Sequence, residues 1–243
     1  MKYTWPSFLI TALLVVGIVA AKAQTADDII QKHIAATGGA DNWKKIYSIK
    51  KICSRNSRGT EQPVIITILR DKGYKTEYTI NGMTSYSIIT DKAGWSYNPF
   101  RGQQKAETMP GESVRQAQDL LDIQGPLIDY KIKNNKITYL GKDDVEGTEC
   151  YKLKVLFPSG KEETIFIDAS DYSLVRTTIK TKANGKEQVQ TATYGDYQKL
   201  PEGIVYPMSV DDGGSLTIKS IEINKPVDEN IFKPTEEAGT EKK

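Results

Sequence analysis

The chain is poor in the side chains that most catalytic and metal-binding sites use. It has one histidine and two cysteines among 243 residues, too few for a structural zinc site of the usual Cys and His ligands. Nucleophile-elbow, P-loop and dinucleotide-binding glycine patterns are absent. We therefore expect no enzymatic activity, no metal and no cofactor.

The chain also lacks a surplus of charge. Its net charge of +2 comes from 33 Lys and Arg against 31 Asp and Glu, and the two extra bases, Lys2 and Lys22, lie in an N-terminal stretch without acids. Binding to nucleic acid by phosphate neutralisation needs a basic surplus, and so does polybasic attraction to anionic lipid. We therefore expect no nucleic-acid partner. A partner of another kind should be held by apolar contact.

Only one long apolar run is present, over residues 8–21. As a helix it would span about 21 Å, less than the roughly 30 Å of a hydrocarbon core. Lys2 precedes the run and Ala21-Lys22-Ala23 follows it, which is typical of a signal peptide and its cleavage site. We predict a signal peptide over residues 1–23, cleaved after Ala23, and a periplasmic protein; a retained membrane anchor is the alternative.

The few reactive side chains have simple structural interpretations. Cys53 and Cys150 either pair in the oxidising compartment or are two buried apolar side chains, and we favour the second. His33 falls late in the first predicted helix, where a role at the helix end is favoured over catalysis. Glu162 and Glu163 are predicted to lie on a solvated strand edge.

Two acidic segments have the spacing of turns. Asp168 and Asp171 lie between strand-like segments, and Asp211-Asp212-Gly213-Gly214 has the same character, so side-chain bonding within a turn is favoured. A carboxylate pair of an exported hydrolase at Asp168 and Asp171, or a weak calcium site at Asp211-Asp212, is the functional alternative.

The periodicity predicts helices followed by many short strands. Thr25 is a good N-cap for a helix of about three turns, a short second helix follows over 42–46, and another is predicted over 112–123. Strand-like runs rich in Ile, Val, Thr and Tyr are joined by tight turns, which indicates antiparallel hairpins. The turn pairs are Asn81-Gly82, Ala93-Gly94, Ser159-Gly160, Asn184-Gly185 and Gly213-Gly214.

This order predicts an α+β fold, with one large curved antiparallel sheet and helices on its inner face. Along residues 74–80 one face carries Tyr74, Tyr78 and Ile80, and the other carries Lys75 and Glu77, so we expect solvent on the second face. An apolar cavity on the inner face and a fully packed core fit the pattern equally well. A domain over 24–234 and a flexible tail over 235–243 complete the predicted organisation.

An aromatic segment is the main candidate for a binding site. Trp95, Tyr97 and Phe100 lie in the segment 94–101, whose predicted strand ends at Pro99, and Trp95 and Tyr97 share a face by period two. They either line an apolar ligand site or are core aromatics of the sheet. The predicted cavity-lining residues are Tyr78, Tyr86, Trp95, Tyr97, Phe100, Leu120 and Leu121.

Four segments resemble the LolA family of periplasmic lipoprotein carriers and the related outer-membrane lipoprotein-sorting proteins. Residues 89–106 contain Trp95-Ser-Tyr-Asn-Pro-Phe100, which is similar to a LolA strand that ends in Trp-x-Tyr-Asn-Pro-Phe. Residues 26–39 resemble the first helix of the broader group. Residues 164–168 with 174–176, and residues 227–234, resemble later segments in the right order.

The resemblance implies an incomplete β-barrel, LolA- and LppX-like, closed by a few helices. It also implies a function: a carrier that holds lipoprotein or lipid acyl chains in an apolar cavity for transfer toward the outer membrane, as a monomer in transient contact with envelope membrane proteins. Arg70 is the positional match to a basic residue that helps to hold the helical lid, although Asp71 follows it where the family has proline. The alternative is an exported sensor or accessory binding domain with the same fold and no lipid cargo.

Overall fold

The computed structural model describes residues 25–57, 59–183 and 186–235. Helix α1 (Ala26–Ala36) begins at the predicted N-cap, where Thr25 and Asp28 bond reciprocally as a capping box. Helix α2 (Ala40–Lys44) follows after Gly38-Gly39. The apolar stripe of α1, formed by Ile29, Ile30 and Ile34, is buried.

Strands make up most of the described chain. They are β1 (Ser48–Ser57), β2 (Thr60–Leu69), β3 (Gly73–Ile80), β4 (Met83–Thr90), β5 (Gly94–Tyr97), β6 (Glu107–Thr108), β7 (Lys136–Val145), β8 (Thr148–Leu156), β9 (Glu162–Asp168), β10 (Leu174–Ala183), β11 (Lys186–Lys199), β12 (Val205–Asp211) and β13 (Ser215–Ile223). The predicted hairpin at Asn81-Gly82 is confirmed: both residues have positive φ, of 50° and 77°, as a type I′ turn requires.

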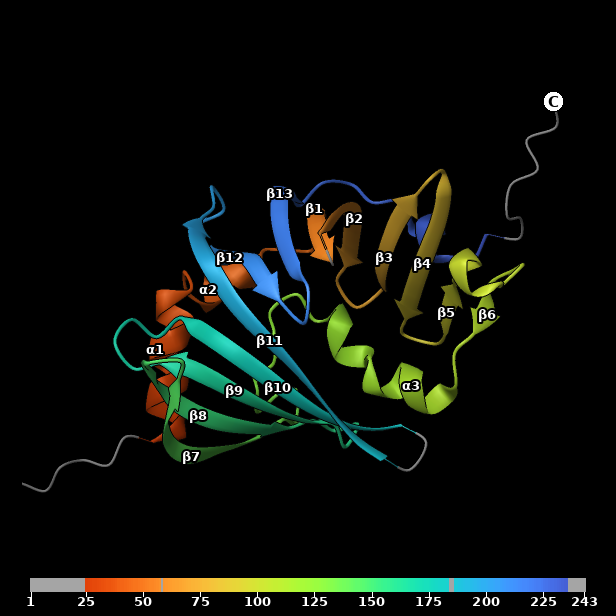
Figure 1. The fold of residues 1–243 in the computed structure, drawn as a ribbon. Coiled ribbons are helices and arrows are strands. Elements are labelled where there is room, and N and C mark those ends of the chain that lie inside the picture. The colour runs from red at the N-terminus through yellow and green to blue at the C-terminus, as the bar shows by residue number, and fades with distance from the viewer. Residues whose placement is uncertain (1–24, 58, 184–185, 236–243) are drawn as a thin grey trace, which may run out of the picture.

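All thirteen of these strands form one antiparallel sheet that is not closed (Figure 1). The sheet consists of two meanders, β1 to β6 and β7 to β13, which are joined where β1 pairs with β13. The free edges are therefore β6 and β7, and the chain passes from one edge to the other through α3 (Gly111–Gln116). The predicted α+β fold with a single curved, incompletely closed sheet is confirmed.

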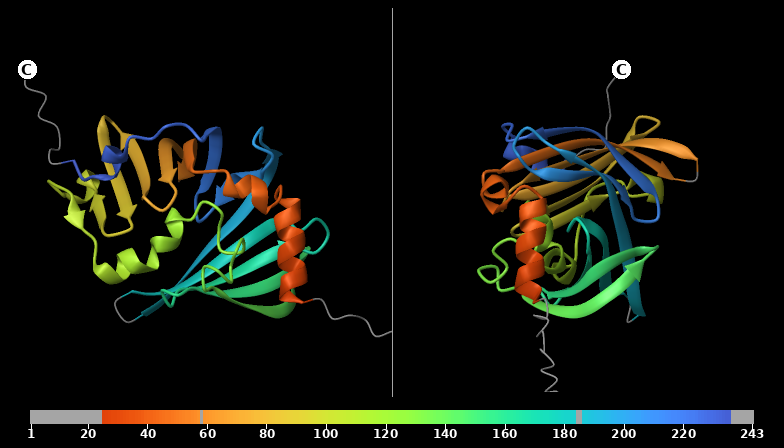
Figure 2. Two further views of the ribbon diagram at one scale, coloured as in Figure 1. Left: turned by 180° about the vertical axis from the view of Figure 1, so that it is seen from behind. Right: turned by 90° about the vertical axis from the view of Figure 1, so that its left-hand side faces the viewer.

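The sheet bends where its two meanders meet. Strand β11 pairs with β10 through its first half and with β12 through its second half. The β12–β13 ladder covers only three residue pairs, Ser209–Asp211 with Thr217–Ser215. Figure 2 shows the result, in which α3 lies across the opening between the two parts of the sheet and α1 stands against β7 to β10.

The helix predicted over 112–123 is shorter and changes type. Helix α3 ends at Gln116 and continues as the 3₁₀ helix η2 (Gln118–Leu121). The tightening begins at Ala117, whose amide lies 3.1 Å from the carbonyl oxygens of both Ser113 and Val114. As a consequence Leu121 is buried, whereas Leu120 is 39% exposed.

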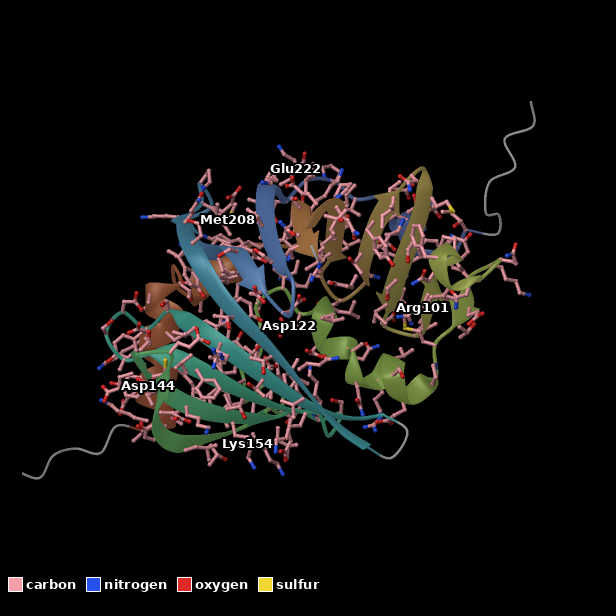
Figure 3. The ribbon with its side chains drawn as sticks, viewed as in Figure 1. Arg101, Asp122, Asp144, Lys154, Met208 and Glu222 are labelled. Atoms are coloured by element: carbon pink, nitrogen blue, oxygen red, sulfur yellow. The ribbon has the colours of Figure 1, made fainter. Side chains whose placement is uncertain are left out.

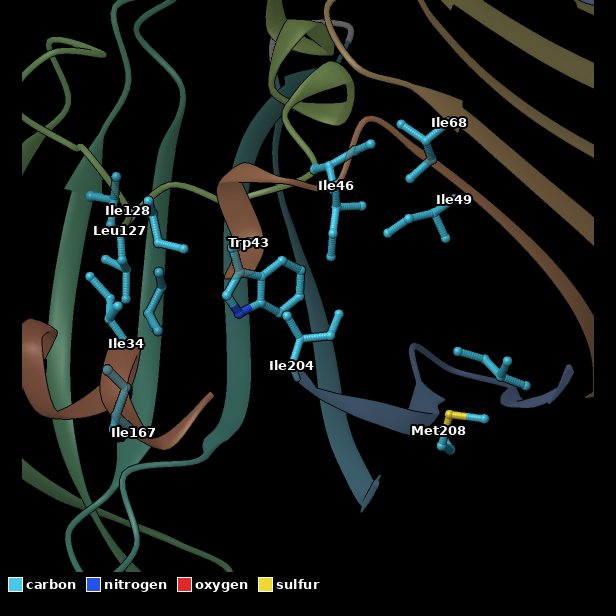
Figure 4. Close-up of a cluster of buried hydrophobic side chains, with 14 of the residues drawn as sticks. Ile34, Trp43, Ile46, Ile49, Ile68, Leu127, Ile128, Ile167, Ile204 and Met208 are labelled. Carbon is cyan, nitrogen blue, oxygen red and sulfur yellow. The ribbon is translucent and has the colours of Figure 1, made fainter. Parts of the chain in front are cut away.

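The main core fills the concave face of the sheet. Trp43 of α2 lies between the side chains around Ile34 and Ile128 and those around Ile204 and Met208 (Figure 4). Its indole nitrogen donates a 2.9 Å hydrogen bond to the Thr37 carbonyl, which satisfies the polar atom of this buried ring. Helices α1 and α2 thus occupy part of the space that the sheet curves around.

The prediction that the face of β3 with Lys75 and Glu77 is exposed to solvent is wrong in part. The C-terminal segment with the 3₁₀ helix η3 (Glu229–Phe232) packs on this outer face, where Phe232 is 4% exposed. The Phe232 ring lies directly over Gly73, because a Cβ at that position would come within 2.3 Å of the ring. The resemblance had marked this segment, but strand periodicity alone does not show that a later segment covers the face.

Several predictions concern residues outside the described ranges. The signal peptide, the Asn184-Gly185 turn and residues 236–243 of the tail all lie there. Thr235, the first predicted tail residue, is described, and its amide and hydroxyl lie 3.2 and 3.0 Å from the Tyr86 hydroxyl. Within the described ranges, no helix has the length and apolar character to cross a membrane.

Candidate functional site

The seven predicted cavity residues lie on two different faces of the sheet. Tyr78 pairs with Val64 and Ser85, which places it on the concave face with the main core. Tyr86 is opposite Glu77 and Tyr97, and the Trp95 side chain shares their face. The prediction that all seven line one cavity is therefore wrong.

The concave group contains Tyr78, Phe100 and Leu121. The Tyr78 and Phe100 rings stack with centroids 6.0 Å apart, and Phe100 remains 40% exposed at the rim. Asn98 donates a hydrogen bond of 3.4 Å to the Tyr78 hydroxyl. Leu121 is buried in η2, and Leu120 faces outward from the same turn.

The outer group, Tyr86, Trp95 and Tyr97, is a separate small core. The rings of Tyr86 and Tyr97 have centroids 5.5 Å apart, and both pack with Trp95 in the cluster around Phe232. Period-two spacing correctly puts Trp95 and Tyr97 on one face. It does not tell which face, because both faces of this part of the sheet are covered.

The concave face is covered by a segment that we call the edge connection, residues 109–135 between β6 and β7. Five of its apolar side chains are at most 8% exposed. They are Val114, Leu121, Ile123, Leu127 and Ile128. Both flanking strands are edge strands, so no ladder in the interior of the sheet depends on this segment.

Polar contacts hold the edge connection in place. The Asp119 carboxylate lies 2.7 Å from the Lys161 ammonium, and the exposed fractions of the two side chains are 22% and 9%. Gln118 donates a 3.0 Å hydrogen bond to the Thr90 carbonyl. The amide of Asp71 donates to the Leu121 carbonyl at 3.2 Å. The contacts with Thr90 and Asp71 join the connection to the first meander, and the contact with Lys161 joins it to the second.

Arg70, the predicted lid residue, lies at the mouth of the concave face. Its guanidinium donates a 3.0 Å hydrogen bond to the Lys44 carbonyl at the end of α2, and its buried Nε has no hydrogen-bond partner among the described residues. The contact from this loop to the edge connection is made by the backbone of the next residue, Asp71. Arg70 therefore touches α2, and its role in holding a lid stays a prediction.

Two of the pockets that border the edge connection lie at the mouth of the concave face or below it. The larger, about 630 Å³, opens at the mouth and is lined mainly by polar side chains, among them Arg70, Asp119 and Asp122. Figure 3 shows Asp122 between the two parts of the sheet. The smaller, about 230 Å³, lies deeper between α1 and strands β9 to β12, and its walls are mainly apolar. Gln124 lines both pockets.

Glu163 is the functional candidate that the sequence interpretation missed. It lines the smaller pocket, and β9 lies between β8 and β10, so the predicted solvated strand edge is wrong. Burial raises the pKa of its carboxyl to about 7, against a smaller opposing effect of Lys161. A signal was available: Glu163 shares the strand face of Ile165 and Ile167.

The other reactive side chains have structural roles. The ring Nδ1 of His33 lies 2.8 Å from the Tyr172 carbonyl, and burial lowers the pKa of the ring. Asp168 and Asp171 accept hydrogen bonds from Ser170 and Ser173 inside the predicted turn. No group of three or more His, Cys, Asp or Glu side chains in the described part of the chain could hold a metal ion.

The cysteines do not form a disulfide. Cys53 and Cys150 are both free and buried, as favoured from the sequence. Cys53 faces the main core, and Cys150 packs with Val145 and Phe166 in another cluster. Burial raises the pKa of both thiols, that of Cys150 to about 11.

Comparison with solved structures identifies the architecture. A LolA superfamily protein from Nitrosomonas europaea superposes with a TM-score of 0.53 at 10% sequence identity, over 87% of this chain and 98% of that one. The chain has the LolA fold. A domain from Vibrio parahaemolyticus, described as an outer membrane lipoprotein-sorting protein, gives a TM-score of 0.51 at 14% identity, over 84% of this chain and 94% of that one.

The LolA fold agrees with the resemblance drawn from the sequence motifs. No protein-family model and no curated protein matches the sequence. At these identities the likeness concerns the fold, and the site must be argued from the residues of this chain.

Proposed function

We propose that this protein is an exported carrier or binding protein that holds the acyl chains of a lipid or lipoprotein against the concave face of its sheet. The observation that carries the proposal is the edge connection. It places five buried apolar side chains on the concave face, yet the chain joins it to the sheet only through two edge strands, and few polar contacts hold it there. An acyl chain that displaced these side chains would occupy the same apolar surface.

Movement of the edge connection is part of the proposal because the closed structure leaves little apolar space on the concave face. The smaller pocket, at about 230 Å³, lies below the roughly 300–1,000 Å³ of ordinary ligand pockets. The larger pocket is polar. Burial of a lipid chain is worth about 0.8 kcal/mol per methylene, so a long chain can outweigh the few contacts that keep the connection closed.

The alternative function is a sensor or accessory binding domain that has the LolA fold and no lipid cargo. The filled concave face favours it, because α1, α2 and the edge connection together occupy most of that surface. In this case the edge connection would stay in place whatever apolar ligand is offered.

Lipid extraction of the protein purified from its native envelope tests the proposal. We expect acyl-bearing lipid near one molecule per protein, and binding of a fluorescent long-chain fatty-acyl probe after delipidation. A protein that is free of lipid and also ignores the probe would support the sensor alternative. The same preparation gives the mature N-terminus, which we expect at Gln24 if the protein is exported and cleaved after Ala23.

A further inference from the structure

The smaller pocket combines apolar walls with one carboxylate that lacks a partner. Ile34, Trp43, Leu127 and Ile165 contribute to its walls. Glu163 lines it from β9, and neither an ion pair nor a hydrogen bond to its carboxylate is made by the described residues. The Glu163 side chain is half-buried, and a donor group of a ligand would give its carboxylate a partner that the described residues do not supply.

Three neighbouring polar groups, those of Tyr194, Tyr197 and His33, are already engaged. The Tyr194 hydroxyl lies 3.2 Å from the Thr177 hydroxyl, and the Tyr197 hydroxyl donates to the Leu174 carbonyl at 2.5 Å. His33 is occupied with the Tyr172 carbonyl. Besides the Gln124 amide, which also lines the pocket, Glu163 is the acceptor that remains for a ligand, and it is the one that can carry a charge.

We propose that this pocket binds a small amphiphile whose head group donates a hydrogen bond and has no negative charge, with Glu163 as the acceptor. At about 30 Å³ for a water-sized group, a pocket of about 230 Å³ admits roughly eight such groups. A primary amine or alcohol on a chain of about seven or eight carbons has this size and chemistry. A carboxylate of the same length would place two acids together, which disfavours it.

This site goes beyond the proposed acyl-chain site, because it needs no movement of the edge connection away from the sheet. The charged and titratable groups around Glu163 are Lys161 next to its strand, Asp119 in η2, His33 in α1, and Tyr194 and Tyr197 in β11. The pair of Lys161 with Asp119 is internally neutral. Ionisation of Glu163 itself should therefore dominate the pH dependence of amine binding.

Titration calorimetry with octylamine, octan-1-ol and octanoate tests the site. At pH 7.5 we expect octylamine to bind at least tenfold more tightly than octanoate, and more tightly at pH 8 than at pH 5.5. Glu163→Gln should reduce octylamine affinity at least tenfold and remove its pH dependence. It should leave octanol within about threefold, since an amide oxygen still accepts a hydrogen bond.

Glu162→Gln is the matched control, because the neighbouring side chain is 46% exposed and points to the opposite face of β9. It should leave all three affinities unchanged. Equal binding of octanoate and octylamine, or an unchanged preference in Glu163→Gln, would overturn the proposed site. The long-chain acyl probe, measured in the same variants, reports on the edge connection separately, so either proposal can fail alone.

Discussion

Loss of the ion pair between Asp119 and Lys161 should make the concave face easier to open. Its atoms lie 2.7 Å apart, and its side chains are 22% and 9% exposed. Exposed pairs are worth about 0–1 kcal/mol and breaking a fully buried pair costs about 3–5 kcal/mol. For this intermediate pair we take about 2 kcal/mol, or roughly a thirtyfold change in the ratio of open to closed molecules.

The change should appear directly in cargo affinity. If only the open form binds, the apparent Kd is the intrinsic Kd divided by the open fraction. Asp119→Asn should therefore tighten binding of a fluorescent fatty-acyl probe by up to about thirtyfold. Lys161→Met should act in the same direction, because it breaks the same contact and leaves unpaired only the Asp119 carboxylate, the more exposed of the two charges.

The control is Asp143→Asn, which breaks a pair with Lys152 of similar length, 2.8 Å, on more exposed side chains. It should leave probe affinity unchanged. Unchanged or weaker probe binding in both Asp119→Asn and Lys161→Met, with the fold intact by circular dichroism, would refute this role of the ion pair.

Three further predictions concern stability and the thiols. The pKa of Glu163 is raised from 4.5 to about 7, so its contribution to stability is complete below pH 4.5 and is lost as the pH rises through 7. Between pH 5 and 8 the free energy of unfolding in urea should fall by up to about 3 kcal/mol less in Glu163→Gln than in the unmodified protein. An equal fall of the free energy of unfolding with pH in both proteins would contradict the burial of Glu163. Phe232→Ala should lower the free energy of unfolding by about 3–5 kcal/mol. Phe100→Ala is the control and should have a much smaller effect, because that ring is 40% exposed. Equal urea midpoints for the two variants would refute the packing of Phe232 over Gly73. Cys53 and Cys150 should both react with a thiol reagent after unfolding without reductant, whereas a chain lighter by two hydrogens would indicate a disulfide.

The sequence predicts the helices and turns of this fold better than it predicts which segments pack against each other. Thr25 and the Ile29, Ile30 and Ile34 stripe determine α1 locally, and Asn81-Gly82 determines a hairpin through backbone conformation. These features depend on neighbours within a few residues, so periodicity and turn chemistry are sufficient.

The candidate site was predicted less well because it depends on long-range packing. Trp95 and Tyr97 share a face as predicted, but the cover that makes this face a separate core is Phe232, more than a hundred residues later. Glu163 was placed at a strand edge because β9 was not known to lie inside the sheet. The motif resemblance predicted the fold. Which face of the sheet each aromatic side chain lies on could be told only from the register of the strands.

Hydrogen exchange on the protein with and without a saturating long-chain acyl ligand tests most directly whether the edge connection moves to admit cargo. We expect amide exchange to rise within residues 109–135, including the turn of η2, and to stay constant in the ladders of β1–β4 and β8–β10. Unchanged exchange in residues 109–135 while the ligand is bound would contradict the proposed opening of the concave face.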